Sequence, residues 1–356
     1  MRASGGLHPD YVSLAEYHAA QWPDVLGVAT FNGSRPLAET ADPVGIPVAQ
    51  ISTPVLAATT DVYEVWRSGE PGQSGQHDRV RFRRTGDTLF GCIAVSEAES
   101  RPADGHASRK SRSGALSALH QATADAYRQI LATLDAQAYP YLLRVWNYVP
   151  DINRDTHGTE RYWEFNSARR HALRASGRPL SGNVPAASAL GAAADSPLVV
   201  YFLAGRTAPT FVENPRQVSA YHYPRQYGPH SPVFSRAALL QQPAGLTLFI
   251  SGTASIVGHR SLHVGDTAAQ TRETLSNIEA LLDEANRVSR GAQFRLGALA
   301  CKVYVRRPAD LPVIQTELNS VLGDGARVIY LQADICRQDL LVEIEAVGMC
   351  PPAAAA

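Results

Sequence analysis

Residues 327–347 read RVIYLQADICRQDLLVEIEAV, two apolar runs separated by a short polar turn. The second run alternates in polarity as a half-buried strand does. One face carries Leu340, Val342, Ile344 and Ala346, and the other carries Glu343 and Glu345. Because a carboxylate is costly to bury without a partner, two interpretations stay open: both glutamates face solvent, or Glu343 lines a cleft and exchanges protons there. Cys336 lies in the turn, where it can reach the same cleft.

The composition excludes several classes of protein. The chain has 356 residues and a formal net charge of zero, which allows one large domain or two ordinary ones and argues against an electrostatic nucleic-acid partner. No apolar run approaches the ~20 residues that span a bilayer, and the first residues form no apolar signal core. The four cysteines form no Cys-x-x-Cys pair, which fits a reducing compartment. We therefore expect a cytoplasmic protein with no nucleic-acid, membrane or metal partner.

Hydrophobic periodicity predicts strands and helices along most of the chain. Helices are expected at 116–136, 160–173, 267–285 and 311–322. Strands are expected at 25–31, 46–51, 61–67, 79–82, 88–96, 141–149, 198–204, 246–251, 301–305, 328–331 and 340–347. The Gly-, Pro- and Ser-rich stretches 68–77 and 177–195 are interpreted as turns or loops, and the Ser-, Arg- and Lys-rich stretch 97–114 as an exposed loop.

The two halves of the chain repeat five short motifs in the same order. The pairs are LFGCIAVSE (from Leu89) and LFISGTASI (from Leu248), QILATLDA (from Gln129) and NIEALLDEA (from Asn277), RVWNYVP (from Arg144) and KVYVRRP (from Lys302), EFNS (from Glu164) and ELNS (from Glu317), and VVYFLA (from Val199) and VIYLQA (from Val328). This order predicts an internal duplication. We place the boundary in the Pro-, Tyr- and His-rich segment 205–236, which gives lobes 1–205 and 206–356, the second carrying Glu343.

The second lobe resembles the YjgF/RidA family. The similar motifs are SGTASIVGHRSLHVGD followed by QTRETLSNIEALL, then CKVYV, Arg327 and VEIEAV. The resemblance implies an α+β fold, built of two tandem α/β sandwich lobes of the chorismate-mutase-like type in a pseudo-trimeric arrangement. Sites in that family lie in clefts between neighbouring units, so a cleft between the lobes is the expected site.

The whole chain resembles a narrower group, the chorismatases. The similar motifs are RVWNYVPDIN, GTERYWEFNSAR, GNVPAASALGA, ENPRQVSAYHYPRQYGP, LFISGTASIVGH and CRQDLLVEIEAV. The resemblance implies chorismate as substrate, pyruvate as one product, no metal or organic cofactor, and a monomer or small homo-oligomer. Gly252 and Cys336 match the branch that forms 3-hydroxybenzoate, some members of which also release 4-hydroxybenzoate. The other branch hydrolyses chorismate to a dihydroxycyclohexadiene acid.

A site for chorismate needs cationic anchors for two carboxylates, a proton source and little water. The predicted substrate contacts are Tyr162, Arg169, Tyr221, Arg225, Gly252 and Arg327, with Arg260 as a further anchor. For each arginine a solvated surface charge is the alternative, and for Gly252 a strand-end turn.

Glu343 is the predicted acid, because an enol ether is activated when its terminal methylene carbon is protonated, and a dry environment raises the pKa of a carboxyl group. Cys336 is predicted to relay protons or shape the site, or else to be a small hydrophobe in the turn. Two other functions stay open: a RidA-like imine or enamine deaminase, and a non-catalytic binding module.

Overall fold

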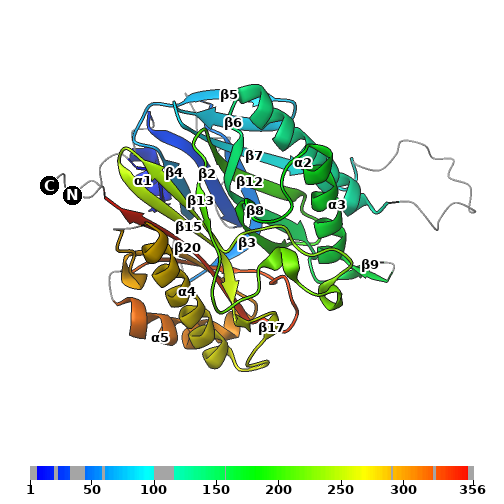
Figure 1. The fold of residues 1–356 in the computed structure, drawn as a ribbon, viewed down its shortest axis with the longest axis vertical. Coiled ribbons are helices and arrows are strands. Elements are labelled where there is room, and N and C mark those ends of the chain that lie inside the picture. Colours follow the sequence, from blue (N-terminus) through cyan, green and yellow to red (C-terminus); the bar gives the residue numbers. More distant parts are fainter. Residues whose placement is uncertain are drawn as a thin grey trace, which may run out of the picture.

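The computed structural model describes residues 6–19, 23–32, 45–57, 61–99, 116–156, 158–289, 292–323 and 326–351. Within this part of the chain the fold is α+β, with a ten-stranded and a six-stranded sheet, as the resemblance implied. Figure 1 shows α2 (Ala118–Gln137) and α3 (Arg161–Ala175) on one side of the molecule and α4 (Thr267–Ser289) and α5 (Leu311–Leu322) on another, with strands between them.

The described chain consists of three consecutive units. The first contains β1 (His8–Ser13), α1 (Leu14–Ala19), β2 (Val25–Asn32), β3 (Val48–Leu56) and β4 (Val62–Arg67). The second contains β5 (Gln73–His77), β6 (Val80–Arg84), β7 (Thr88–Val95), α2, β8 (Tyr141–Pro150), α3, β11 (Ala186–Ala192) and β12 (Leu198–Gly205). The third contains β13 (Thr210–Val212), β14 (Ala237–Gln242), β15 (Gly245–Ala254), α4, β18 (Ala300–Val305), α5, β19 (Arg327–Gln332) and β20 (Val342–Cys350). Two short hairpins complete the strands: β9 (Asp155–Thr156) with β10 (Thr159–Glu160), and β16 (Ile256–Val257) with β17 (Arg260–Ser261).

The same strand pairing recurs in all three units. In the second unit β8 pairs parallel with β11 and antiparallel with β12, which pairs antiparallel with β7. In the third unit β18 pairs parallel with β19 and antiparallel with β20, which pairs antiparallel with β15. In the first unit β2 pairs parallel with β3 and antiparallel with β4, which pairs antiparallel with β1. The predicted duplication is therefore part of a threefold repeat, and the smallest copy lies in residues 8–67, where the sequence showed no repeat.

Sheet membership cuts across the predicted lobe division. The first and third units share the ten-stranded sheet, because β3 pairs with β19 through Leu56–Tyr330 and Val55–Leu331. The second unit forms the six-stranded sheet. The division at 205 and 206 separates the second unit from the third but places the first unit with the second, and it stays a prediction. The oligomeric state stays one too.

Two stretches that were interpreted as turns or loops contain strands. Residues 177–195 include β11, whose sequence AASALGA has few of the β-branched and aromatic residues that favour strands. It forms one because it pairs with β8 and is largely buried. The fifth motif pair was therefore wrong: β12 corresponds to β20, and β19 corresponds to β11. Residues 68–77 likewise include β5. The predicted loop 97–114 lies outside the described residues from position 100 onward.

Helices cover the outer faces of the two sheets, and the inner faces of the three units meet in one central cluster. In the second unit α2 and α3 bury their apolar stripes on the sheet, and in the third unit α4 and α5 do the same. Large aromatic side chains fill the centre, including Trp66, Trp146, Tyr201 and Tyr304. None of the helices in the described ranges is long and apolar enough to cross a membrane.

Candidate active site

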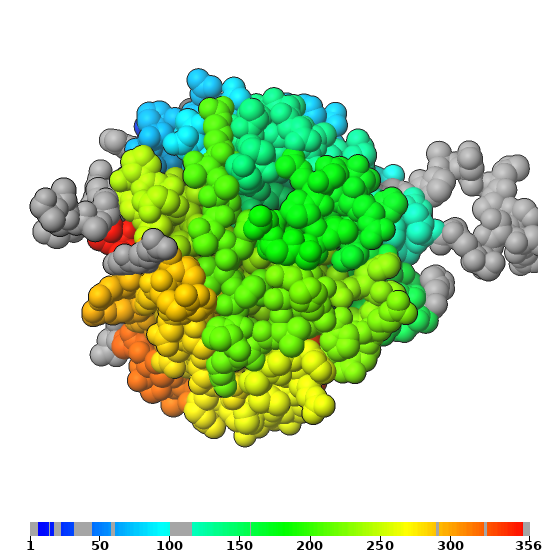
Figure 2. Space-filling view, in the orientation of Figure 1, coloured from blue at the N-terminus to red at the C-terminus, as the bar shows by residue number. Residues whose placement is uncertain are grey.

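A cleft of about 410 Å³ lies between the second and third units, and it continues into an inner recess of about 40 Å³. Walls come from α3, β15, β20, the turn between β19 and β20, and the segment 206–236. That segment appears in green to lime in Figure 2, where it crosses the visible face between the second and third units. Cleft and recess share the residues Tyr162, Pro232, Phe234, Gly252, Cys336 and Glu343.

Glu343 points into this cleft from β20 and is buried, with 4% of its surface exposed. Glu345 is equally buried, so the interpretation in which both glutamates face solvent is wrong. Burial, followed by the negative charge of Glu345, raises the pKa of Glu343 to about 8. The carboxyl group therefore carries its proton at neutral pH, which is the state required of a proton donor.

Gly252 lies directly against this carboxyl group. The pairing of β15 with β20 shifts register between Ile250 and Thr253, which brings the glycine backbone close to the partner strand. A Cβ atom at position 252 would overlap Glu343 Oε1 and lie 2.8 Å from its Cδ atom. The backbone N–H of Gly252 donates to Ser188 Oγ at 3.1 Å. The absence of a side chain therefore makes room for the acid.

Three arginines of the cleft and recess each have a buried nitrogen without a hydrogen-bond partner among the described residues: Arg169 Nη2, Arg236 Nε and Arg337 Nη2. Another nitrogen of each guanidinium is held by a hydrogen bond. Arg169 donates to Tyr127 Oη at 2.7 Å, Arg236 to Tyr223 Oη at 2.7 Å, and Arg337 to the His259 carbonyl at 2.9 Å. Buried polar groups are normally paired, so these N–H groups are available to an anionic ligand.

Two neutral proton-bearing groups lie beside the acid. Burial raises the pKa of the Cys336 thiol to about 12, with a further contribution from Glu343. Burial also raises the pKa of the Tyr162 phenol well above its ordinary value. Both groups therefore stay protonated at neutral pH and can donate hydrogen bonds, whereas a thiolate nucleophile is disfavoured at Cys336.

The structure brings Glu343, Cys336, Tyr162, Arg169 and Gly252 together in the cleft and its recess. It does not bring three other predicted contacts to them. Tyr221 packs against the core of the second unit, Arg225 is exposed on a short 3₁₀ turn, and Arg327 is exposed at the start of β19. Arg260, at the start of β17, is exposed as well.

Sequence reasoning missed four residues of the cleft. From the segment 206–236, Tyr223 and Tyr227 line it in place of Tyr221 and Arg225. The two 3₁₀ turns of that segment (Ala220–His222 and Arg225–Tyr227) set which side chains face inward. Arg236 and Arg337 were missed as well. The position of Arg337 beside Cys336 in the predicted turn was the available signal.

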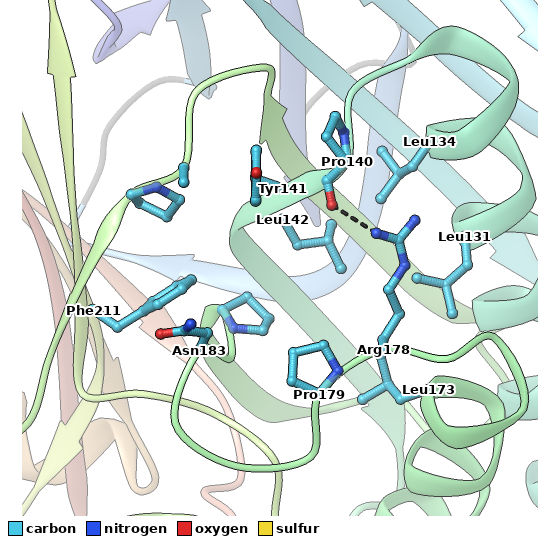
Figure 3. A pocket seen from close by; sticks show the side chains of 13 residues that line it. Leu131, Leu134, Pro140, Tyr141, Leu142, Leu173, Arg178, Pro179, Asn183 and Phe211 are labelled. Atoms are coloured by element: carbon cyan, nitrogen blue, oxygen red, sulfur yellow. Dashed lines mark hydrogen bonds between the residues drawn. The ribbon is translucent and has the colours of Figure 1, made fainter.

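A separate pocket of about 310 Å³ lies between the C-terminal parts of α2 and α3 and the start of β8. Figure 3 shows its mainly apolar lining, with Arg178 donating to the Pro140 carbonyl. Arg178 also forms an ion pair with Asp135, so the cation is already neutralised. This pocket has no acid of raised pKa in its lining, and the chemistry points to the cleft at Glu343.

The chain is similar to chorismatases by three comparisons. Residues 64–204 match the family described as "Chorismatase FkbO/Hyg5-like, N-terminal". A 3-hydroxybenzoate synthase of Streptomyces hygroscopicus is 35% identical over 315 residues, which cover 86% of each chain. A chorismatase of Streptomyces rapamycinicus is 39% identical over 292 residues, covering 80% of this chain and 81% of that one. A chorismatase crystal structure aligns with a TM-score of 0.83 and 31% identity over 98% of this chain and 100% of its own.

Proposed function

This chain belongs to the chorismatase family, and from that premise we propose that it converts chorismate to 3-hydroxybenzoate and pyruvate. The observation that carries the proposal is the buried, protonated carboxyl group of Glu343 beside Gly252. It lies in a cleft that also presents buried, unpaired N–H groups of arginines. Chorismate, a dianion with an acid-labile enol ether, is complementary to both features.

Glu343 gives its proton to the terminal methylene carbon of the enolpyruvyl group, which turns the ether into an oxocarbenium ion. The oxygen of the ring hydroxyl then attacks the ring carbon that bears the ether, whose C–O bond breaks and releases pyruvate. The hydroxyl proton returns to the Glu343 carboxylate. Opening of the resulting epoxide and loss of the proton on the carbon that keeps the oxygen give the phenol. All atoms of chorismate appear in the two products, so water and redox partners are unnecessary.

The arginines define where the two carboxylates bind. Arg169 in the inner recess and Arg236 and Arg337 in the outer cleft present donors at both ends of the space around Glu343. Arginine suits this role because its planar fork binds both oxygens of a carboxylate. Arg337 is held over the rings of Tyr223 and Tyr227, at 5.1 and 3.8 Å from their centroids. Its stacked position fixes the guanidinium before the ligand arrives.

Incubation of the purified protein with chorismate, followed by chromatography and a coupled pyruvate assay, tests the proposal. We expect 3-hydroxybenzoate and pyruvate in equal amounts, formed at least ~100-fold more slowly by Glu343→Gln. If the dihydroxycyclohexadiene acid were the only ring product, the protein would instead be assigned to the hydrolytic branch of the family. Hydrolysis of 2-aminoacrylate with no turnover of chorismate would instead support the deaminase alternative. Any 4-hydroxybenzoate appears in the same chromatogram.

A further inference from the structure

A buried charged cluster lies where the three units meet, behind the cleft. Glu345 on β20 accepts three hydrogen bonds there and forms an ion pair. Oε2 accepts from Arg144 Nη2 and Ser188 Oγ, both at 2.7 Å. Oε1 accepts from Trp146 Nε1 at 2.6 Å and lies 3.0 Å from Lys302 Nζ. Since donors surround both oxygens, Glu345 is held as a carboxylate.

The cluster extends to the first unit. Lys302 Nζ donates to Glu64 Oε2 at 2.7 Å and to Tyr201 Oη at 2.8 Å. Tyr201 in turn donates to Glu64 Oε2 at 2.9 Å. Two carboxylates, Glu64 and Glu345, therefore face two cations, Lys302 and Arg144, in a site from which water is excluded. The charges of these four groups balance when both carboxyl groups are ionised, and an ionised Glu343 would place a further negative charge close to Glu345.

Glu343 and Glu345 are two residues apart on one face of β20, and their carboxyl groups repel when both are charged. A link between them runs through Ser188, whose hydroxyl donates to Glu345 and accepts from the N–H of Gly252. Gly252 is the residue against which the Glu343 carboxyl rests. The charge of Glu345 thus affects the protonation of Glu343, and its hydrogen bond to Ser188 affects the position of the Glu343 carboxyl group.

We propose that Glu345 is a positioning residue for the reaction: the carboxylate fixed at the junction of the three units keeps Glu343 in its acid form and, through Ser188 and Gly252, sets where that acid lies. This inference rests on the proposed role of Glu343. The charged and titratable groups that act on Glu343 or line its cleft and recess from the surrounding elements are Glu345, Glu160, Asp339, Arg144, Arg169, Arg236, Arg306, Arg337, Cys336, Tyr162, Tyr223 and Tyr227.

The test uses two variants that are expected to shift the pKa of Glu343 in opposite directions. Glu345→Gln removes a negative charge and leaves Arg144 and Lys302 in excess, so Glu343 should lose its proton at lower pH. Lys302→Met removes a positive charge of the same cluster, so Glu343 should keep its proton to higher pH. The double variant restores the balance and should return towards wild type. Glu284→Gln, which removes a surface carboxylate paired with Arg287, is the matched control and should behave as wild type.

Two readouts are needed. Infrared difference spectra, with the Glu343 band assigned by its absence in Glu343→Gln, follow the protonation of the acid directly. The alkaline limb of kcat/KM follows its consequence. We expect both to move down by at least one pH unit in Glu345→Gln and up in Lys302→Met. Movement in the same direction in both variants, or no movement, would overturn the inference. If Glu345→Gln does not fold, the direction of the shift in Lys302→Met decides.

The infrared titration separates this inference from the proposed function. Full turnover by Glu343→Gln would show that Glu343 is not the acid of the proposed reaction, even if the two cluster variants shifted the infrared titration in opposite directions. If Glu343→Gln were inactive and the infrared titration of Glu343 were unchanged in the cluster variants, only the positioning role of Glu345 would be refuted.

Discussion

Gly252→Ala should misplace the acid without unfolding the protein. The new Cβ atom would lie 2.8 Å from Glu343 Cδ, whereas nonbonded carbon atoms prefer about 3.5–4.0 Å. The carboxyl group therefore has to move by roughly 0.7–1.2 Å. Ser188 Oγ, 3.2 Å from the same Cβ position, restricts movement of the alanine towards β11. Since the Glu343 carboxyl is the end of a flexible side chain, the acid is the group that yields.

A misplacement of about 1 Å can cost on the order of 100-fold in rate, which corresponds to about 2.7 kcal/mol of transition-state stabilisation. We expect 3-hydroxybenzoate formation to fall by roughly that factor. The product should also shift towards the dihydroxycyclohexadiene acid, since ~1.4 kcal/mol between competing transition states changes a ratio tenfold. Adding Cys336→Ala should increase the shift, because it removes a second proton-bearing group of the cleft. Single-turnover kinetics with chromatography of the products measures both effects.

Two further variants make the prediction for Gly252 specific. Gly86→Ala is the control, because the nearest atom to its new Cβ is 3.9 Å away and no rate change is expected. Gly252→Ala combined with Glu343→Asp shortens the acid and should recover part of the lost rate. Wild-type rate and product ratio in Gly252→Ala alone would refute the packing argument.

Other predictions follow from the same cleft. Glu343→Gln should lower turnover by at least ~100-fold while circular dichroism shows an intact fold, since general acid catalysis contributes ~10²–10⁴-fold; a near wild-type rate would remove Glu343 as the acid. The raised pKa of about 8 means that the active, protonated form persists below that pH and is lost above it, so kcat/KM should be level near pH 7 and fall about tenfold per unit at high pH; an alkaline limb near pH 5 would contradict this. Arg236→Ala and Arg337→Ala should each weaken chorismate binding by roughly 2–5 kcal/mol, whereas Arg225→Ala, at an exposed site, should leave KM unchanged.

The parts of the fold that were predicted correctly are those with strong local periodicity. The expected helix at 311–322 coincides with α5, and the expected strand at 141–149 with β8 extended by one residue. β11 was missed because its small residues carry little strand propensity, and its pairing with β8 is a tertiary effect. The first unit was missed as a repeat because a strand topology shared by three units leaves no sequence motif when the sequences diverge.

The site was predicted in part for a related reason. Glu343 and Gly252 lie on adjacent paired strands, so a motif in each was sufficient to bring them together. Arg236 and Arg337 come from irregular segments, where backbone turns decide which side chain faces inward, and sequence spacing does not encode that direction. Arg225 was predicted from such a segment, and the structure leaves it exposed and outside the cleft lining.

The threefold repeat explains why this chain has its acid in one place. Glu64, Tyr201 and Glu345 are placed alike, each on the last strand of its unit and each paired with the central strand, opposite Ala29, Trp146 and Lys302. This register differs by two residues from the third motif pair, which aligned Arg144 with Lys302. Their side chains converge on the same cluster, where Lys302 contacts all three. Two residues earlier on each strand, the side chains are Val62, Val199 and Glu343. Of these three positions, the one in the third unit carries a carboxylic acid and the other two carry valine. The polar cluster joins the three units, and a glutamate where the other two units have valine gives one of three similar junctions the acid of the proposed reaction.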